Sequence, residues 1–430
     1  MPKPTRRTFT LLIALALSAT VTAGQRAAPT NGAANGVALE RFKRLDAVLQ
    51  EHIDQNRIAG VVVLVLKDGK PVYERALGWS DKEANRRMTV DTIFRIASQS
   101  KALTSAAILS LMEEGRLTPS MPVSRFIPAF EKTTVAVKSD TGVSTVPARR
   151  QITIADLLTH TAGISYGTDS LVASQYEAKG LGPAAGYGWY TADKEEEVCV
   201  TMERLATLPF VAQPGDSYVY GYNTDILGCV VERASGMPLD KYIADRITTP
   251  LGMKDTYFYL PAAQRDRLAT VYSSGPDGTI VRAPEGPRGQ GNYVEGPRKS
   301  FSGGAGLLST ARDYARFLEM TRNGGVLDGV RVLSPRSVAL MTTNQSGTLH
   351  STTGLGFGFG FETVDRYGAS GLSSVGAYRW GGAYGSNYLV DPDARIVLAY
   401  MIQQMPNRTD LGQLIPTLVY QALTDPPKTK

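Results

Sequence analysis

The stretch Ile96-Ala97-Ser98-Gln99-Ser100-Lys101 stands directly before a long, alanine-rich apolar run. From residue 98 to residue 114 apolar side chains recur at helical spacing, and Gly115 predicts the end of the helix. Residues i and i+3 share one face of a helix, so Lys101 is expected one turn from Ser98. The spacing therefore places an amine within reach of a hydroxyl at a helix N-terminus.

Ser98 and Lys101 match the S-x-x-K pattern of a catalytic serine and its partner lysine. A serine hydroxyl is a weak nucleophile until a base removes its proton. A free lysine, with a pKa of about 10.4, is protonated at neutral pH, but burial or nearby positive charge lowers that pKa. A capped helix with a surface lysine gives the same pattern. Ser100 is a poorer nucleophile than Ser98, because it neighbours Lys101 in sequence and points elsewhere.

A second serine motif competes with Ser98. The stretch Gly163-Ile164-Ser165-Tyr166-Gly167 matches G-x-S-x-G, which in α/β-hydrolases requires a strand before it and a helix after it. Here a predicted helix over residues 155–160 precedes the motif, and a loop rich in glycine, alanine and tyrosine follows it to residue 190. The context argues against Ser165 as the nucleophile, and we expect the loop to form part of a pocket wall.

Strand patterns lie near both ends of the chain and helical patterns lie between them. Residues 61–66 and 72–77 predict one hairpin, and residues 388–390 and 396–401 predict another. Helices are predicted over residues 194–208, 224–234 and 239–247, and capping patterns begin helices after Thr153 and Thr310. We therefore predict an α/β (α+β) fold with an antiparallel sheet built from both chain ends and flanked by helices. Residues 38–125 and 270–430 would form the discontinuous sheet domain, and residues 126–269 a mainly helical insertion.

The N-terminus has the pattern of a targeting segment. Basic residues precede an apolar run over residues 11–19, which is too short to span a bilayer, and small residues lead to a cleavage site after Ala23. We expect a signal peptide over residues 1–23, a linker over residues 24–37, and an exported, periplasmic or secreted protein without a stable membrane anchor. Thr5-Arg6-Arg7-Thr8-Phe9 resembles a twin-arginine signal, so that route and the general secretory route both stay open.

Charge, cysteine and histidine content limit the partners, disulfides, metals and cofactors that we expect. The formal net charge of the 430 residues is +6, and removal of the signal peptide, which carries three basic residues and no acids, leaves +3. No basic block stands out, so we expect no nucleic-acid partner. Cys199 and Cys229 could pair in an exported protein, whereas the apolar run around Cys229 suggests a buried thiol. We expect neither metal nor cofactor, because the three histidines lie far apart without ligand spacing: His52, His160 and His350.

Two further stretches accompany the Ser98 motif, one over residues 218–228 and one at Trp380-Gly381-Gly382-Ala383. With residues 96–101 they resemble the three motifs of the serine β-lactamase and penicillin-recognising superfamily. The resemblance is greatest to family VIII carboxylesterases, which look like class C β-lactamases. It covers about residues 42–423, including the segments 158–163, 250–256 and 303–310. It implies a β-lactamase/transpeptidase-like fold.

The resemblance also implies roles for individual residues. Ser98 would be the acylated nucleophile and Lys101 its partner. Tyr220 matches the motif tyrosine, because Asp-Ile-Leu-Gly follows over residues 225–228 at the family spacing, and it would pass a proton to the leaving group. Its neighbours Tyr218 and Tyr222 are the alternatives to it. The backbone N–H groups of Ser98 and Ala383 would form the oxyanion hole. Further residues would contact the substrate: Trp380, Gly381 and Gly382, where the glycines let it lie close to the strand.

Two departures from the family pattern bear on the substrate. The second motif of β-lactamases and D,D-peptidases usually ends in Asn, but Tyr222 holds that position, and Asn223 would have to contact the substrate instead. Their third motif usually begins with Lys, whereas Trp380 carries no charge for a substrate carboxylate. We therefore expect a small-molecule ester substrate with a small acyl group. A class C-like β-lactamase or D-amino-acid peptidase is the alternative. A non-catalytic penicillin-recognising sensor ranks last, because Ser98, Lys101 and Tyr220 are all present.

Overall fold

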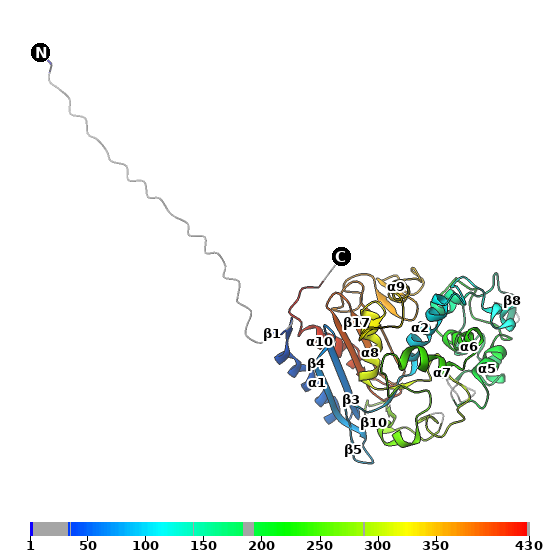
Figure 1. Cartoon of the computed structure of the whole chain (residues 1–430), viewed down its shortest axis with the longest axis horizontal. Coiled ribbons are helices and arrows are strands. Elements are labelled where there is room, and N and C mark those ends of the chain that lie inside the picture. The colour runs from blue at the N-terminus through cyan, green and yellow to red at the C-terminus, as the bar shows by residue number, and fades with distance from the viewer. Residues whose placement is uncertain (3–32, 35, 141, 184–192, 287–288, 428–430) are drawn as a thin grey trace.

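The computed structural model describes residues 1–2, 33–34, 36–140, 142–183, 193–286 and 289–427. The predicted signal peptide, beyond its first two residues, and most of the predicted linker at 24–37 lie outside this range, as do residues 184–190 of the predicted pocket-wall loop. In the described part of the chain a large antiparallel sheet stands beside a largely helical region (Figure 1). No helix in that part is long and apolar enough to cross a bilayer.

The sheet is built from both chain ends, as predicted. Its strands follow the order β14-β15-β16-β17-β18-β3-β4-β5, and each neighbouring pair is antiparallel. The two predicted hairpins, β3–β4 and β17–β18, join where β18 pairs with β3. The strands are β3 (Gly60–Lys67), β4 (Lys70–Asp81), β5 (Arg86–Arg87), β14 (Leu355–Phe357), β15 (Glu362–Val364), β16 (Tyr378–Gly381), β17 (Asn387–Asp391) and β18 (Ile396–Met401).

Alternate side chains of the central strands enter two separate cores. On β3, Val61, Val63 and Val65 pack with α1 (Lys43–Asp54) and α10 (Leu411–Tyr420). Val62 and Leu64 face the other way, towards α8 (Ala311–Arg322) and α2 (Ser100–Glu113). Figure 1 shows α8 between the sheet and the helical region, with α1 and α10 on the opposite side. A slip of one residue would exchange the two sets, so burial on both faces fixes the register.

Helix α2 runs through the centre of the molecule. Eleven of its fourteen residues are buried, which is the pattern of a helix enclosed on nearly all sides. The predicted helix at 98–114 is confirmed, although its first turn is a separate 3₁₀ turn, η2 (Ala97–Gln99). The core around α2 therefore holds the residues that follow Ser98 in a fixed position.

The helical region agrees with prediction in some places and differs in others. Thr153 caps its helix with both hydrogen bonds of a capping box. The helix predicted at 194–208 begins later, because Lys194 donates to the Gly180 carbonyl and Glu196 binds Arg204. A hairpin of β7 (Thr134–Ser139) and β8 (Gly142–Pro147) was not predicted. The helices are α3 (Ile154–Leu158), α4 (Ala173–Ala178), α5 (Val198–Leu205), α6 (Asn223–Ser235), α7 (Leu239–Ile243), the π-helix η6 (Ala244–Thr248) and α9 (Pro335–Thr342).

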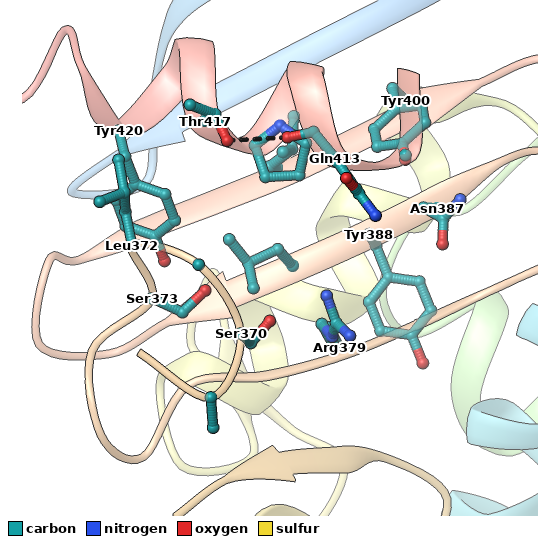
Figure 2. A pocket seen from close by; sticks show the side chains of 16 residues that line it. Ser370, Leu372, Ser373, Arg379, Asn387, Tyr388, Tyr400, Gln413, Thr417 and Tyr420 are labelled. Atoms are coloured by element: carbon teal, nitrogen blue, oxygen red, sulfur yellow. Dashed lines mark hydrogen bonds between the residues drawn. The ribbon is translucent and has the colours of Figure 1, made fainter. Parts of the chain in front are cut away.

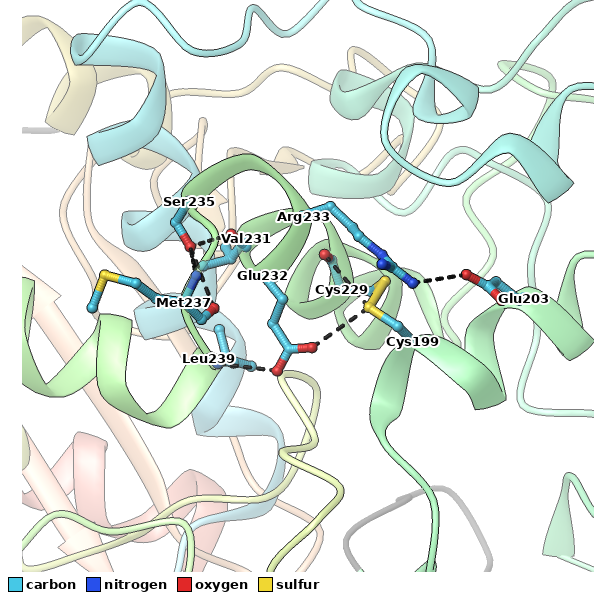
Figure 3. Close-up of a disulfide and its surroundings, with 9 residues drawn as sticks. All are labelled: Cys199, Glu203, Cys229, Val231, Glu232, Arg233, Ser235, Met237 and Leu239. Carbon is cyan, nitrogen blue, oxygen red and sulfur yellow. Dashed lines mark hydrogen bonds and ion pairs between the residues drawn. A yellow bond between two sulfur atoms is a disulfide. The ribbon is translucent and has the colours of Figure 1, made fainter.

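A disulfide joins two helices of this region. Cys199 of α5 and Cys229 of α6 are paired, with their Cα atoms 5.0 Å apart (Figure 3). The expectation of a free thiol at Cys229 is therefore wrong, although the residue is buried as expected. Helix α6 packs against α5, and this packing brings the two sulfur atoms together.

Candidate active site

The turn that carries Ser98 lies between a short strand and α2. The strand β6 (Phe94–Arg95) pairs with β11 (Leu308–Ser309), and the Ser100 hydroxyl accepts a hydrogen bond of 3.0 Å from the Leu307 N–H. Ser100 is therefore turned away from Lys101, as the sequence predicted. Ala97 is buried and has a φ of +45°, a strained conformation for a residue with a side chain. The surrounding contacts keep the Ala97 backbone in this conformation, and the neighbouring Ser98 is partly exposed.

Lys101 is buried with its amine beside Ser98. Its Nζ lies 3.3 Å from Ser98 Oγ, 3.0 Å from the Tyr166 hydroxyl and 2.7 Å from the Gly304 carbonyl oxygen. Three acceptors match the three N–H donors of an ammonium group. The predicted Ser98–Lys101 pair therefore exists in space, and two distant segments of the chain complete it.

Tyr166 is a member of this cluster that the sequence did not reveal. It lies at the centre of the competing motif around Ser165, and only the fold brings its hydroxyl to Lys101, 65 residues away. Burial, and then the neighbouring Tyr220, raise the pKa of Tyr166 well above its ordinary value. Tyr166 is thus a neutral phenol that accepts a hydrogen bond from Lys101. No local pattern marks it, because its role depends on packing between distant segments.

Of the three candidate tyrosines, the structure places Tyr220 beside Lys101 and Trp380. The Lys101 amine lies 4.7 Å from the centre of the Tyr220 ring. Trp380 Nε1 donates to the Tyr220 hydroxyl at 3.3 Å. Tyr222 instead accepts from the Gly182 N–H, and Tyr218 packs on the ring of His350 at 4.5 Å. The geometry therefore favours the predicted choice of Tyr220.

The third motif lies against the turn of Ser98. A side chain at Gly382 would collide with the Ile96 carbonyl oxygen, and one at Gly381 would collide with Asn387. These glycines thus permit close contacts within the protein, in addition to the predicted space for a substrate. Ala383 follows in an exposed turn. Within the described ranges, the N–H groups of Ser98 and Ala383 have no backbone acceptor, as an oxyanion hole requires.

Asn223 does not take the position predicted for it. It is fully buried at the start of α6, where its amide nitrogen contacts His160 Nδ1 at 3.0 Å and two backbone carbonyls. These contacts use the amide hydrogens, so Asn223 holds the loop of His160 and offers no donor to a substrate. Since Tyr222 also points elsewhere, neither residue supplies the amide of the usual second motif.

The ring of His160 packs against the ring of Tyr220. Its ring centre lies 4.7 Å from that of Tyr220. Burial, and then the positive charge of Lys101, hold the pKa of His160 well below its ordinary value, so the imidazole is neutral.

No group of three or more metal-ligating side chains occurs in the part of the chain that the structure describes.

An aromatic wall continues from Trp380. Phe357 packs edge-on against Trp380 at 5.2 Å, and His350 lies between Tyr218 and Trp380. His350 also binds Glu362 at 2.9 Å. The site thus combines a serine, an amine, two phenols and an apolar wall. Such a set can transfer an acyl group through the serine oxygen.

Comparison with known proteins identifies the family of the chain. The model of the beta-lactamase family matches residues 45–418. Protein Rv1367c of Mycobacterium tuberculosis (strain H37Rv) is 37% identical over 379 residues, 84% of this chain and 90% of that protein. Esterase EstB of Burkholderia gladioli is 34% identical over 366 residues, 81% of this chain and 86% of the esterase. The solved structure of EstCE1, a hydrolase with promiscuous acyltransferase activity, has a TM-score of 0.75 and 28% identity, covering 90% of this chain and 100% of that one.

Proposed function

The chain belongs to the beta-lactamase family and is a serine hydrolase, and from this premise we propose that it cleaves carboxylic esters of small acyl groups through an acyl-enzyme on Ser98. The esterase EstB, at 34% identity, supports an ester substrate. The observation that carries the proposal is Trp380. Its indole N–H is directed at the Tyr220 hydroxyl, and no positive charge stands at this position to bind a substrate carboxylate.

The proposed reaction uses each residue of the cluster. Ser98 Oγ forms a bond to the ester carbonyl carbon while its proton passes to the Lys101–Tyr220 pair. The N–H groups of Ser98 and Ala383 stabilise the negative charge on the carbonyl oxygen. The carbon–oxygen bond of the ester then breaks, and the alcohol leaves with the proton held by the pair. In the second half, water attacks the acyl carbon and its proton passes to the same pair. The bond between that carbon and Ser98 Oγ then breaks, Oγ takes the proton back from the pair, and the acid is released.

Trp380 has a second role in this scheme. Its N–H donates to the Tyr220 oxygen and therefore stabilises negative charge there. The Lys101 amine acts on the same ring from 4.7 Å. The Trp380 N–H and the Lys101 amine together stabilise the Tyr220 oxygen when it carries negative charge, so Tyr220 can pass the proton between Ser98 and the leaving group.

A β-lactamase or D-amino-acid peptidase is the second candidate, because it would use the same nucleophile. Both of its usual substrate contacts are missing. Tyr222 takes the Asn position, which the buried Asn223 does not replace, and Trp380 takes the Lys position. A penicillin-recognising sensor that does not turn over its ligand would lack a catalytic group. In this structure Ser98, Lys101 and Tyr220 lie together. The ester reaction therefore ranks first.

Hydrolysis of p-nitrophenyl acetate and butyrate should be compared with hydrolysis of nitrocefin, using the mature protein. We expect rapid cleavage of both esters, little cleavage of nitrocefin, and loss of ester cleavage in Ser98→Ala. Faster turnover of nitrocefin would favour the β-lactamase. Stable acylation of Ser98 without release would favour the sensor.

We also propose that the protein is exported by way of its N-terminal segment. The Cys199–Cys229 disulfide supports this proposal, because such bonds persist in oxidising compartments. Fractionation of cells that produce the full chain should give a mature protein that begins after Ala23, outside the cytoplasm. Replacement of Arg6 and Arg7 by Lys would stop export by the twin-arginine route and leave the general route intact. A full-length chain retained in the cytoplasm would overturn the proposal.

A further inference from the structure

A cavity of about 380 Å³ lies on the face of the sheet opposite to α2 and α8. It is bounded by α10, by the strands β16, β17 and β18, and by the loop over residues 369–373 (Figure 2). Its volume is within the range of small-molecule sites. Arg379 on β16 lines this cavity, whereas the next residue, Trp380, faces the catalytic cluster. The two neighbours point to opposite faces because side chains alternate along a strand.

Arg379 is the charged residue among those that line the cavity. The other lining residues are apolar or carry neutral polar side chains, Tyr400 and Gln413 among them. The Arg379 side chain is 38% exposed, and its Nε donates to Glu362 at 2.6 Å. Within the described chain, its two terminal nitrogens have no hydrogen-bond acceptor. Glu362, the cross-strand neighbour of Arg379, is not among the lining residues, and it also binds His350. The guanidinium therefore has donors left for a ligand.

Tyr400 adds a second unused donor. The residue is 1% exposed and lines the cavity, and its hydroxyl donates no hydrogen bond to any described residue, although the Asn387 side chain interacts with its oxygen. Burial raises the pKa of Tyr400, so the hydroxyl keeps its proton at neutral pH. A buried hydroxyl without a partner costs free energy unless something binds it. Figure 2 shows Tyr400 and Gln413 on the same side of the cavity, with Arg379 across from them.

The chemistry of the lining selects the ligand. A cation would meet Arg379 with no lining carboxylate to balance it, and a purely apolar molecule would leave the guanidinium and the Tyr400 hydroxyl unsatisfied. A carboxylate accepts two parallel hydrogen bonds from a guanidinium, and it can accept another from a phenol. We propose that this cavity is a second binding site, specific for a small organic carboxylate held by Arg379 and Tyr400. The proposal does not depend on the ester reaction, because the site lies across the sheet from Ser98.

Titration calorimetry with benzoate, and with benzamide as its neutral analogue, tests the proposal on the mature protein at pH 7. We expect one benzoate per chain and binding of benzamide at least about tenfold weaker. Arg379→Gln should weaken benzoate binding at least about tenfold, and Tyr400→Phe should weaken it several-fold. Arg75→Gln is the matched control, because Arg75 is an exposed arginine of β4, a strand of the same sheet, and it pairs with Asp46 of α1. It should bind benzoate like the wild type.

Three results would overturn the second site. These are no binding of benzoate up to its solubility limit, equal binding of benzamide, and benzoate binding that neither Arg379→Gln nor Tyr400→Phe weakens. The last result would place benzoate elsewhere, for example at Ser98. If Arg379→Gln fails to fold, Tyr400→Phe decides alone, because it removes a single oxygen that donates to no residue in the described structure.

Discussion

Two serines of this chain lie in sequence motifs of hydrolases, and their surroundings differ. Ser98 stands partly exposed at the start of a buried helix, with the Lys101 amine 3.3 Å from its oxygen. Ser165 is buried in a loop, and its oxygen accepts a hydrogen bond of 3.1 Å from the Gly167 N–H. The Ser98 hydroxyl contacts the amine of Lys101, whereas the Ser165 hydroxyl stabilises a turn of its own loop.

The loop of Ser165 nevertheless serves the site of Ser98. Its next residue, Tyr166, contacts Lys101, and its backbone packs so closely on Gly221 that a side chain there would collide with Ile164 and Ser165. The competing motif is thus part of the wall that positions Lys101 and the loop of Tyr220. A serine motif marks a reactive residue only where the fold places a base beside it.

The largest expected effect separates the two serines directly. Ser98→Ala should lower kcat/KM for p-nitrophenyl butyrate by about four orders of magnitude or more, because the acyl-enzyme cannot form. Ser165→Ala should change it only a few-fold, because the loss is one hydrogen bond within a loop. Mass spectrometry after treatment with a fluorophosphonate should find the label on Ser98. Label on Ser165, or an inactive but folded Ser165→Ala, would break the contrast.

The second effect concerns the tyrosines beside these loops. Tyr220→Phe should lower kcat by about 10²- to 10⁴-fold with little change in KM, because it removes the proton carrier and leaves the ring. Tyr218→Phe is the matched control, since the Tyr218 hydroxyl is buried without a partner in the described part of the chain. It should retain nearly full activity in the same steady-state assay. The reverse order of effects would assign the proton transfer to Tyr218.

The main frame of the fold could be predicted from local patterns. The β-branched run at 61–66 gave β3, the apolar spacing after Ser98 gave α2, and Thr153 gave the capping box of α3. The β7–β8 hairpin was missed, although Val135 and Val137 alternate with other residues in β7, because helical patterns surround it.

The site could be predicted only where residues lie close in sequence. Ser98 and Lys101 follow from helical spacing, and Tyr220 follows from its distance to the residues at 225–228. The contacts of Tyr166, Asn223 and the two cysteines were missed or left open, because each joins segments that are 30 or more residues apart. Such pairs depend on packing between segments, and no short sequence pattern records them.

A third effect measures how much the Ser165 loop contributes to Ser98. Tyr166→Phe should lower kcat about tenfold, because Lys101 loses one of its three hydrogen-bond acceptors. It should also shift the pH profile of kcat/KM, since the lost hydroxyl contacts the amine beside the nucleophile. Tyr176→Phe removes a buried hydroxyl that has no partner in the described ranges and should move neither quantity. Equal effects of the two variants would reduce Tyr166 to a packing residue.

The smallest effect is on stability, at the helix that leads into the Ser165 loop. Asp156 of α3 is buried, which alone would raise its pKa, but two hydrogen bonds from Arg150, at 2.6 and 2.9 Å, and those from Thr153 hold that pKa below its ordinary value. The contribution of Asp156 is therefore full above its unfolded pKa of about 3.9 and is lost as the pH falls through the lower folded pKa.

Asp156→Asn should accordingly lower the free energy of unfolding by about 1 kcal/mol at pH 6, and the difference from wild type should disappear in strong acid. Urea unfolding at a series of pH values measures this difference. Asp216→Asn serves as the control, because Asp216 pairs with Arg149 at an exposed position, where ion pairs contribute little. A constant deficit at all pH values would mean that Asp156 acts through its cap geometry alone. In either case ester hydrolysis at pH 7 should stay near wild type, because the loop of Tyr166 is also held by its packing on Gly221.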